Sequence, residues 1–383
     1  MEYDFSIAPE LPFTVIQNGA DTELWFSTPA DPEMTYTLTA RPIDTDHAAQ
    51  QAQWQFTPRR PDVIYMVLQE QGSDLWVTSL ENPQSRKLTS TNGGIQDYAV
   101  SPGGEQIVFS VINSQNGFDL WTIDRNGENM LQTQTCGPDT CTDVAFLPSS
   151  GDYAFVQNSR TDTGEVVSRI WLKKSGSQEA QVLYEQSGGG VSDLKWSPDG
   201  SMLAFVNETR FQIQFLFLDN LKVSVVDCES SETGGWSTDG SQMVFACTGS
   251  EQDSPCKDLK EVNPLTLKIT DSPLQELNGQ RDYSAPVWSL DGKWIVFGER
   301  CYSDRPTRQL WLVDAQTQKG EQITNEPLYN FANYHWDPFS QIMVLQRYEM
   351  GSASAAPDVM LWKLSTEELE LLAEGGHSPQ WLP

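Results

Sequence analysis

Basic residues are scarce in this 383-residue sequence: 24 lysines and arginines stand against 53 aspartates and glutamates, which gives a formal net charge of −29. A surface this acidic repels phosphate backbones, so no nucleic acid partner is expected. Anionic membranes and polysaccharides are disfavoured for the same reason. Cationic partners and divalent cations are compatible with the charge, and solubility of a strand-rich protein is its plainer explanation.

Long apolar runs are also missing. No stretch of 18 apolar residues occurs, so we expect no membrane span. The first five residues, Met-Glu-Tyr-Asp-Phe, carry neither the basic start nor the apolar core of a signal peptide. We therefore expect either a cytosolic protein or one whose signal or membrane anchor is not part of this sequence.

Familiar catalytic motifs are absent as well. The sequence has no Gly-x-Ser-x-Gly nucleophile motif, no His-Glu-x-x-His zinc motif, no phosphate-binding Gly-x-x-x-x-Gly-Lys loop and no dinucleotide fingerprint. A pair of catalytic carboxylates is compatible with the acidic composition, but no spacing selects one pair. No enzyme class is therefore indicated by motif.

The sequence does contain an internal repeat, aromatic-Ser-x-Asp-Gly followed by a strand-forming run. Its clearest copies begin at Trp196, Trp236 and Trp288. With the weaker copies, the opening residues give eight anchors, at positions 54, 100, 146, 196, 236, 288, 336 and 381. A Leu-Trp-like pair also recurs eight times, at 24–25, 75–76, 120–121, 170–171, 216–217, 259–260, 310–311 and 361–362.

Each repeat unit predicts four short strands, A to D. Strand A carries the anchor, and Ser-x-Asp-Gly turns the chain because Gly supplies a positive φ and Asp caps the turn. Units that bury their faces only against neighbouring units are typical of propeller blades. We therefore expect an all-β fold, a single closed β-propeller forming one domain over residues 1–383. Eight four-stranded blades are expected, with seven as the alternative.

These motifs resemble the TolB-like family of β-propeller repeats. The resemblance covers essentially the whole chain and rests on the Trp-Ser-Pro-Asp-Gly turn at 196–200, the Leu-Trp strands and the Asp-x-x-Gly turn at 124–127. It implies the propeller fold. It does not imply one activity, because the family includes partner-binding proteins and peptidase gate domains.

Ring closure is the least regular part of the pattern. The last anchor, Trp381, has no strands B to D after it, so we expect the C-terminal strand to become strand A of the N-terminal blade. Phe5 is the rival, since the N-terminus could supply its own strand A. The expected blades are 376–383 with 11–41, then 47–90, 94–133, 140–184, 190–227, 233–271, 283–325 and 331–373.

One face of the ring is expected to carry function. The A–B and C–D turns are short, whereas the B–C and D–A connections on the opposite face include long loops; we call that side the loop-rich face. All six cysteines map to it. An even number of loop cysteines predicts disulfides and an oxidising compartment. We expect Cys136–Cys141 and Cys247–Cys256, with Cys228–Cys301 by elimination; Cys247 or Cys256 bonded to Cys301 stays open.

Candidate ligand-binding residues lie on or near strand A, which lines the channel of a propeller. Asp97, Asp143 and Asp193 each precede an anchor by three residues and predict an acidic arc. The arc is explained either by hydrogen bonds to backbone N–H groups or by a cation site, with calcium as the candidate ion and no other cofactor expected. The three histidines, His47, His335 and His377, lie on strand A or just before it in three consecutive units on the other side of the ring; His47 and His377 are further candidates at the channel mouth.

Basic side chains stand out against this acidity on the loop-rich face. The candidates to receive a carboxylate, such as a peptide terminus, are Arg281, Arg300, Tyr302, Arg305 and Arg308. The plainer explanation is solvated loop charge.

Together these features favour a non-catalytic binding or scaffold propeller that is secreted, periplasmic or on the cell surface. It would engage a protein or peptide through the loop-rich face. Two alternatives stay open: an enzyme with channel carboxylates (a hydrolase, a lyase or the gate propeller of a peptidase), and a surface protein that assembles with itself.

Overall fold

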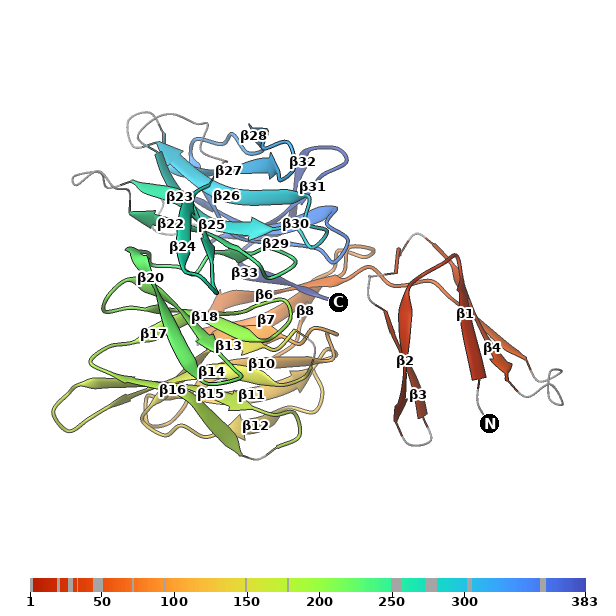
Figure 1. Cartoon of the computed structure of the whole chain (residues 1–383), viewed down its shortest axis with the longest axis horizontal. Coiled ribbons are helices and arrows are strands. Elements are labelled where there is room, and N and C mark those ends of the chain that lie inside the picture. Colours follow the sequence, from red (N-terminus) through yellow and green to blue (C-terminus); the bar gives the residue numbers. More distant parts are fainter. Residues whose placement is uncertain are drawn as a thin grey trace. The chain divides into compact units, whose positions relative to one another are not determined.

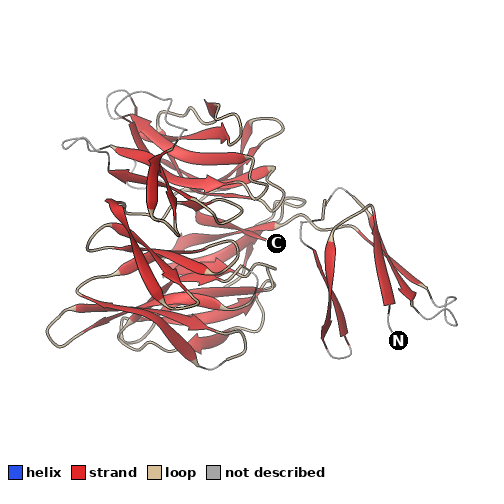
Figure 2. Cartoon of the chain, viewed as in Figure 1, coloured by secondary structure: helices blue, strands red, loops and turns tan. Residues whose placement is uncertain are grey.

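The computed structural model describes residues 3–18, 21–26, 30–32, 34–43, 51–70, 72–91, 94–148, 150–177, 179–248, 256–272, 281–301, 305–351 and 356–383. All regular structure in these ranges is strand (Figure 2). No helix that could cross a bilayer occurs in them. The chain divides into two compact units, Met1–Pro61 and Asp62–Pro383, and each is described by itself.

The smaller unit consists of a three-stranded sheet and a hairpin. The sheet has the order β1 (Tyr3–Ala8), β4 (Tyr36–Pro42), β5 (Ala52–Phe56), and the hairpin is formed by β2 (Phe13–Asn18) and β3 (Asp21–Phe26). Tyr36 is buried and stacks on Phe56 with ring centroids 5.6 Å apart. Trp54, an expected blade anchor, instead lies on β5 and is 52% exposed.

The larger unit is built from seven four-stranded antiparallel sheets, numbered here in chain order of their second strands (Figure 1). Sheets 2 and 3 are joined by one parallel pair, between Phe118 and Thr140. Sheet 1 consists of β33 (Gly376–Leu382), β6 (Asp62–Gln69), β7 (Gly72–Thr78) and β8 (Arg86–Lys87), and sheet 2 of β9 (Ile95–Val100), β10 (Gln106–Ile112), β11 (Phe118–Asp124) and β12 (Leu131–Gln134). Sheet 3 consists of β13 (Thr140–Phe146), β14 (Tyr153–Arg160), β15 (Val166–Lys173) and β16 (Ala180–Ser187), sheet 4 of β17 (Val191–Trp196), β18 (Met202–Asn207), β19 (Gln212–Phe217) and β20 (Lys222–Glu229), and sheet 5 of β21 (Gly235–Trp236), β22 (Met243–Thr248), β23 (Lys257–Asn263) and β24 (Lys268–Asp271). Sheet 6 consists of β25 (Arg281–Trp288), β26 (Trp294–Cys301), β27 (Arg305–Asp314) and β28 (Gly320–Gln322), and sheet 7 of β29 (Tyr329–Trp336), β30 (Ile342–Glu349), β31 (Asp358–Lys363) and β32 (Glu368–Ala373).

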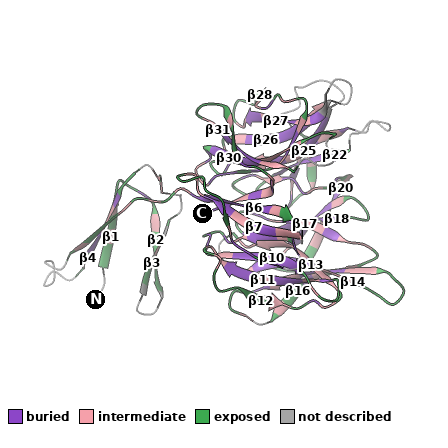
Figure 3. Cartoon of the chain, turned by 180° about the vertical axis from the view of Figure 1, so that it is seen from behind, coloured by how far each residue is buried: buried purple, intermediate pink, exposed green. Residues whose placement is uncertain are grey.

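The core of this unit lies between the sheets. Seven apolar clusters each combine side chains of two consecutive sheets, and one of them packs Val344 of sheet 7 against Tyr65 and Trp381 of sheet 1. The second strands are the most deeply buried, as in Met202–Asn207 (Figure 3). Burying one Leu or Phe side chain contributes about 1.5–3 kcal/mol. Each sheet is therefore stabilised mainly by its two neighbours.

The Ser-x-Asp-Gly turns have the predicted geometry. In the copy at Ser197, the hydroxyl donates to Asp199 Oδ1 at 2.6 Å, and the N–H of Gly200 donates to the Ser197 carbonyl at 2.8 Å. Gly200 has a φ of +71°, a left-handed conformation that suits glycine. The same serine-to-aspartate bond recurs at Ser237 and Ser289. These turns set the first strand against the second in sheets 4, 5 and 6.

Two predictions about ring closure are wrong. The C-terminal strand β33 pairs with β6, with Trp381 opposite Val63, and not with strands of residues 11–41. Phe5 pairs with Ala40 inside the smaller unit. The physical reason is burial: β6 is apolar and buried and needs a partner on both edges, whereas the exposed Trp54 packs no such interface. Because residues 1–61 form a separate unit, the described part of the chain provides seven four-stranded sheets, and an eighth blade is not confirmed.

Candidate functional site

The first strands of the sheets share a bulge three residues before the anchor, which we call the bulge position. Its occupants in sheets 3, 4, 6, 7 and 1 adopt left-handed backbone conformations with φ between +46° and +54°: Asp143, Asp193, Ala285, Asn333 and Ser378. The strand register shifts at each of these residues. A bulge leaves one residue outside the ladder, so its N–H is available to another acceptor.

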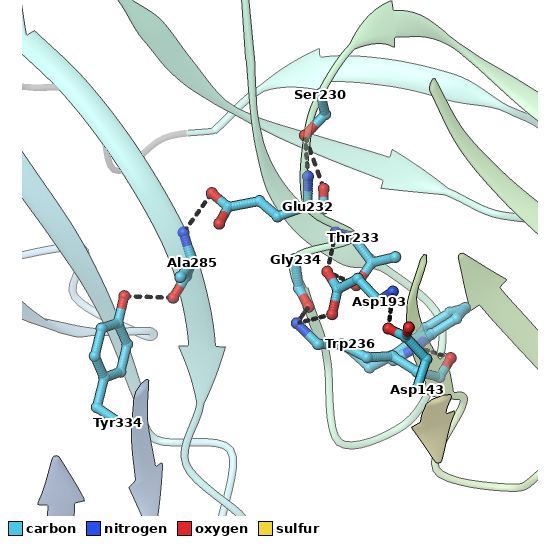
Figure 4. A network of polar contacts seen from close by, with 10 residues as sticks. Asp143, Asp193, Ser230, Glu232, Thr233, Gly234, Trp236, Ala285 and Tyr334 are labelled. Carbon is cyan, nitrogen blue, oxygen red and sulfur yellow. Dashed lines mark hydrogen bonds and ion pairs between the residues drawn. The ribbon is translucent and has the colours of Figure 1, made fainter. Parts of the chain in front are cut away.

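Neighbouring sheets supply that acceptor. The N–H of Asp143 donates to Asp97 Oδ2 at 2.5 Å, and the N–H of Asp193 donates to Asp143 Oδ1 at 2.9 Å. Asp193 Oδ2 then accepts from both the N–H and the hydroxyl of Thr233, at 2.7 and 2.9 Å. Glu232 continues the series by accepting from the N–H of Ala285 at 2.7 Å (Figure 4).

The predicted acidic arc is therefore real, and its carboxylates connect sheets 2 to 6. This arrangement matches the explanation by backbone hydrogen bonds. A fifth bond of this kind joins sheets 7 and 1, from the N–H of Ser378 to Gln346 Oε1 at 3.0 Å. Among the described residues no group of three or more His, Cys, Asp or Glu is placed to hold a metal ion, and calcium at the three aspartates stays a prediction.

The three aspartates differ in acidity. Burial raises the pKa of Asp97, and burial together with the nearby charges of Asp97 and Asp193 raises the pKa of Asp143 to about 6. Burial also opposes ionisation of Asp193, but Lys195 and the hydrogen bonds from Thr233 outweigh it and lower the pKa of Asp193. Lys195 Nζ lies 3.6 Å from Asp193 Oδ1. In the arc, Asp97 and Asp143 thus have raised pKa values, whereas Asp193 has a lowered pKa and is ionised.

The histidines lie at different places along the first strands. His335 is on β29 and is exposed by surface area, but the protein atoms around its ring and the charge of Lys195 lower its pKa to about 4, so it is neutral at pH 7. Lys195 belongs to sheet 4 and His335 to sheet 7, so the two first strands are within electrostatic reach of one another. His377 is on β33, and burial lowers its pKa. His47 lies outside the described residues.

The predicted arginine cluster is partly assembled. Arg300 Nε donates to Asp282 Oδ2 at 2.8 Å, and Arg308 Nη2 lies 3.7 Å from the same oxygen. Asp282 is buried, so the pairing stabilises a charge away from water. The side chains of Arg281, Tyr302 and Arg305 lie outside the described residues.

The cysteines form one predicted and one unexpected disulfide. Cys136–Cys141 is confirmed. Cys228 bonds to Cys247, so the expected pairs Cys247–Cys256 and Cys228–Cys301 are wrong. The alternation of β22 explains why: Cys247 is on the same side as Met243 and Phe245, which pack against sheet 4, where Cys228 lies. The side chain of Cys301 lies outside the described residues, so a bond between Cys256 and Cys301 stays a prediction.

Sequence reasoning missed the donors and acceptors that complete the inter-sheet contacts. Besides Glu232 and Gln346, two tyrosines that follow the bulge position take part: Tyr98 donates to the Ser378 carbonyl at 2.5 Å, and Tyr334 donates to the Ser284 carbonyl at 3.1 Å. Counting three residues back from every anchor would have marked the bulge position in each sheet, but it would not have identified Glu232, Gln346 or the two tyrosines.

A small polar pocket lies on sheet 1. It has a volume of about 310 Å³ and is lined by Gln69, Glu70, Gly72, Asp74, Lys87, Ser90 and Thr91. Asp74 is buried there, and its two oxygens accept from Thr89, Thr91 and Lys87. Its carboxylate is thus engaged in holding β7 to β8 and the residues that follow.

The comparisons with known proteins support the fold. No family model matches the chain. A component of eukaryotic translation initiation factor 3 from Xenopus laevis is 21% identical over 276 residues, 68% of this chain and 36% of that protein. The chain thus spans about a third of that relative's length.

Among solved structures, TolB from Acinetobacter baumannii matches with a TM-score of 0.51 at 10% identity, over 99% of this chain and 83% of that one. An oligogalacturonate lyase in complex with manganese matches with a TM-score of 0.59 at 13% identity, over 94% and 96%. The β-propeller domain of the Trilobed protease from Pyrococcus furiosus matches with a TM-score of 0.54 at 12% identity, over 89% and 94%. The chain is similar to TolB-like β-propellers in fold, as its repeats predicted.

Proposed function

We propose that residues 62–383 form a closed seven-bladed propeller that binds a protein or peptide through its loop-rich face, without chemistry of its own. The proposal rests on one observation, that the carboxylates of the acidic arc are engaged in hydrogen bonds between sheets. Asp97, Asp143 and Asp193 each accept a backbone N–H from the next sheet, so the carboxylates nearest the expected channel serve to join blades. The loop-rich face, formed by the B–C and D–A connections, then remains as the surface that can bind a partner.

The disulfides support an extracytoplasmic location. Cys136–Cys141 and Cys228–Cys247 lie at the strand ends next to the connections of the loop-rich face, with Cys141, Cys228 and Cys247 inside β13, β20 and β22. Disulfides persist in oxidising compartments and are rare in the cytosol. The loop-rich face would thus be stabilised by disulfides in the same compartment in which it meets its partner.

Site-specific photo-crosslinking tests which face binds. A benzophenone amino acid would replace Thr163, which is exposed in the β14–β15 connection of the loop-rich face, or Gln316, which is exposed in the β27–β28 turn of the other face. Each variant would be mixed with extracytoplasmic extract of the organism that makes the protein. We expect a discrete crosslinked partner with the label at 163 and none at 316. Crosslinks of equal yield at both positions, or at 316 alone, would contradict the proposal.

An enzyme is the second candidate, and one observation favours it. The pKa of Asp143 is raised to about 6, and a carboxyl group with such a pKa suits general acid catalysis. Because an oligogalacturonate lyase with manganese shares the fold, the first assay would use oligogalacturonate with Mn²⁺ and follow unsaturated products by ultraviolet absorbance. Turnover that Asp143→Asn abolishes would establish this candidate and overturn the non-catalytic proposal.

A further inference from the structure

The junction between sheets 6 and 7 differs from other junctions of the larger unit. The bulge position of sheet 6 is Ala285, which has no side-chain acceptor to offer to the N–H of Asn333 in sheet 7. The indole N–H of Trp336 is buried without a partner, as is that of Trp288 at the preceding junction, whereas those of Trp196 and Trp381 donate to carbonyls of the preceding sheet at 3.0 and 2.9 Å. At this junction the acceptors that sheet 6 supplies are therefore backbone carbonyls, those of Ser284 and Ala285, which accept from the Tyr334 hydroxyl.

Two more donors lie together on the face of sheet 6. Ser284 is 4% exposed and its hydroxyl has no partner, and Nε of Arg308 is buried without one. Both side chains lie over the bare Cα of Gly298: a Cβ there would come within 2.7 Å of Ser284 Oγ and 2.5 Å of Arg308 Cδ. Glycine at this position therefore leaves room for the Ser284 hydroxyl and the aliphatic part of the Arg308 side chain on the same part of sheet 6.

The guanidinium of Arg308 is only loosely paired. Its nearest carboxylate is Asp282, at 3.7 Å, and that group already accepts from Arg300 Nε at 2.8 Å and from the N–H of Lys257 at 3.3 Å. The side chain of Arg308 is 30% exposed, near the start of β27 and next to the β26–β27 connection of the loop-rich face. The guanidinium is therefore partly accessible and only weakly neutralised by its neighbours.

We propose that Ser284 and Arg308 bind a carboxylate of the protein or peptide ligand, either a C-terminus or an Asp or Glu side chain. The inference rests on the proposed binding function and names the chemistry recognised. A carboxylate only accepts hydrogen bonds, and one of its oxygens fits a guanidinium while the other fits a hydroxyl. One guanidinium matches a single negative charge, whereas a doubly charged phosphate would add repulsion from Asp282.

Small carboxylates test the site by saturation-transfer NMR on the full chain. N-acetylglycine stands for a C-terminus, aspartate blocked at both backbone ends stands for an acidic side chain, and N-acetylglycinamide is the uncharged control. We expect at least one carboxylate to bind and the amide not to bind. Ser284→Ala and Arg308→Gln should each weaken the binding about tenfold, because each removes a hydrogen bond to a charged group.

Arg169→Gln is the matched control. Arg169 is 29% exposed, close to the value for Arg308, but Glu185 pairs with it at 2.6 Å, so this variant should bind as the wild type does. Equal weakening by Arg169→Gln, equal binding of the amide, or unchanged binding in both site variants would overturn the site. Thermal midpoints confirm that each variant is folded. If Arg308→Gln is not folded, Arg308→Lys keeps the charge, loses the fork geometry and should still weaken binding.

The crosslinking experiment separates this site from the proposed function. A partner that crosslinks at 163 equally well in wild type and Arg308→Gln would leave the binding function standing and remove the carboxylate site. Carboxylate binding that Arg308→Gln removes, with no partner crosslinked from the loop-rich face, would keep the site and contradict the proposed function.

Discussion

Asp143 meets two requirements of the bulge position: a left-handed backbone and an acceptor for a hydrogen bond from the next sheet. Its backbone is left-handed, with a φ of +53°, which aspartate tolerates better than most residues, and its carboxylate accepts the next bulge N–H. Asp193 combines the same two properties. Aspartate at the bulge position is therefore explained by backbone conformation and inter-sheet bonding together.

The pKa values of Asp143 and His335 predict opposite pH dependences of stability. The folded pKa of Asp143, about 6, lies above its unfolded value, so its contribution is present at low pH and is lost as pH rises through about 6. The folded pKa of His335, about 4, lies below 6.5, so its contribution is lost as pH falls from about 6.5 to 4. Relative to wild type, Asp143→Asn should gain stability as pH rises from 4 to 7, and His335→Gln should gain as pH falls.

Urea unfolding midpoints at four pH values across this window check both variants. Asn at 143 keeps an acceptor oxygen for the N–H of Asp193, so the inter-sheet bond is retained and the charge alone is removed. Midpoints of the two variants that run parallel to those of the wild type, or that shift in the same direction with pH, would contradict the assignment.

Ala285 is the bulge residue that fits its position worst. It is left-handed, with a φ of +46°, and its side chain offers no acceptor to Asn333. Ala285→Asn should stabilise the protein by about 1 kcal/mol, since asparagine tolerates this conformation and supplies an acceptor without adding charge next to Glu232. Ala285→Gly relieves the conformation alone, so urea denaturation should rank the free energies of unfolding as Asn, then Gly, then Ala. A less stable Asn variant would show that its side chain does not reach sheet 7.

At the scale of elements, the sequence predicted most strands of the larger unit, because its turns are chemically explicit. Ser-x-Asp-Gly at 197–200 and 289–292 marks the turn between first and second strands, and the apolar run after it marks a buried strand. The inter-sheet bonds were predicted only in part. Asp97 was recognised because it shares its residue type with Asp143 and Asp193, whereas Glu232 does the same work from the preceding position and carries no repeating signal.

The repeat pattern placed the strands of residues 11–56 in the propeller, whereas they belong to the smaller unit. The pair at 24–25 and the tryptophan at position 54 match the repeat in residue type, but periodicity does not reveal which face is buried. Trp54 is 52% exposed, whereas Trp381, on the strand that pairs with β6, is 7% exposed. Pairing between strands far apart in sequence is settled by tertiary packing, which composition does not encode.

The two disulfides should contribute unequally. Cys228–Cys247 spans 19 residues and joins sheets 4 and 5, whereas Cys136–Cys141 spans 5. Loop-closure entropy predicts that removing the longer bridge costs about 1 kcal/mol more than removing the shorter one. Paired alanine variants of each bridge, compared in urea, check the difference, and peptide mapping without reductant checks the connectivity. A larger loss from the Cys136–Cys141 pair would show that local strain dominates.

At the scale of the whole molecule, the proposed ring is expected to depend on both ends of the larger unit and not on the smaller one. β33 pairs with β6, and Trp381 packs against sheet 7 and donates to the His335 carbonyl at 2.9 Å. Deleting residues 376–383 would remove the first strand of sheet 1, expose an edge of the buried β6 and break the packing between sheets 7 and 1.

Two truncations therefore predict opposite outcomes. A chain of residues 62–383 keeps all seven four-stranded sheets and should unfold cooperatively, with a thermal midpoint within a few degrees of the full chain's. A chain of residues 1–375 should lose that midpoint and become sensitive to limited proteolysis across the larger unit, because each sheet is stabilised by its neighbours. Circular dichroism melting and protease digestion distinguish the two. If 1–375 stayed protected while 62–383 did not, the smaller unit would be part of the ring, and closure by β33 would be the wrong account of how this propeller holds together.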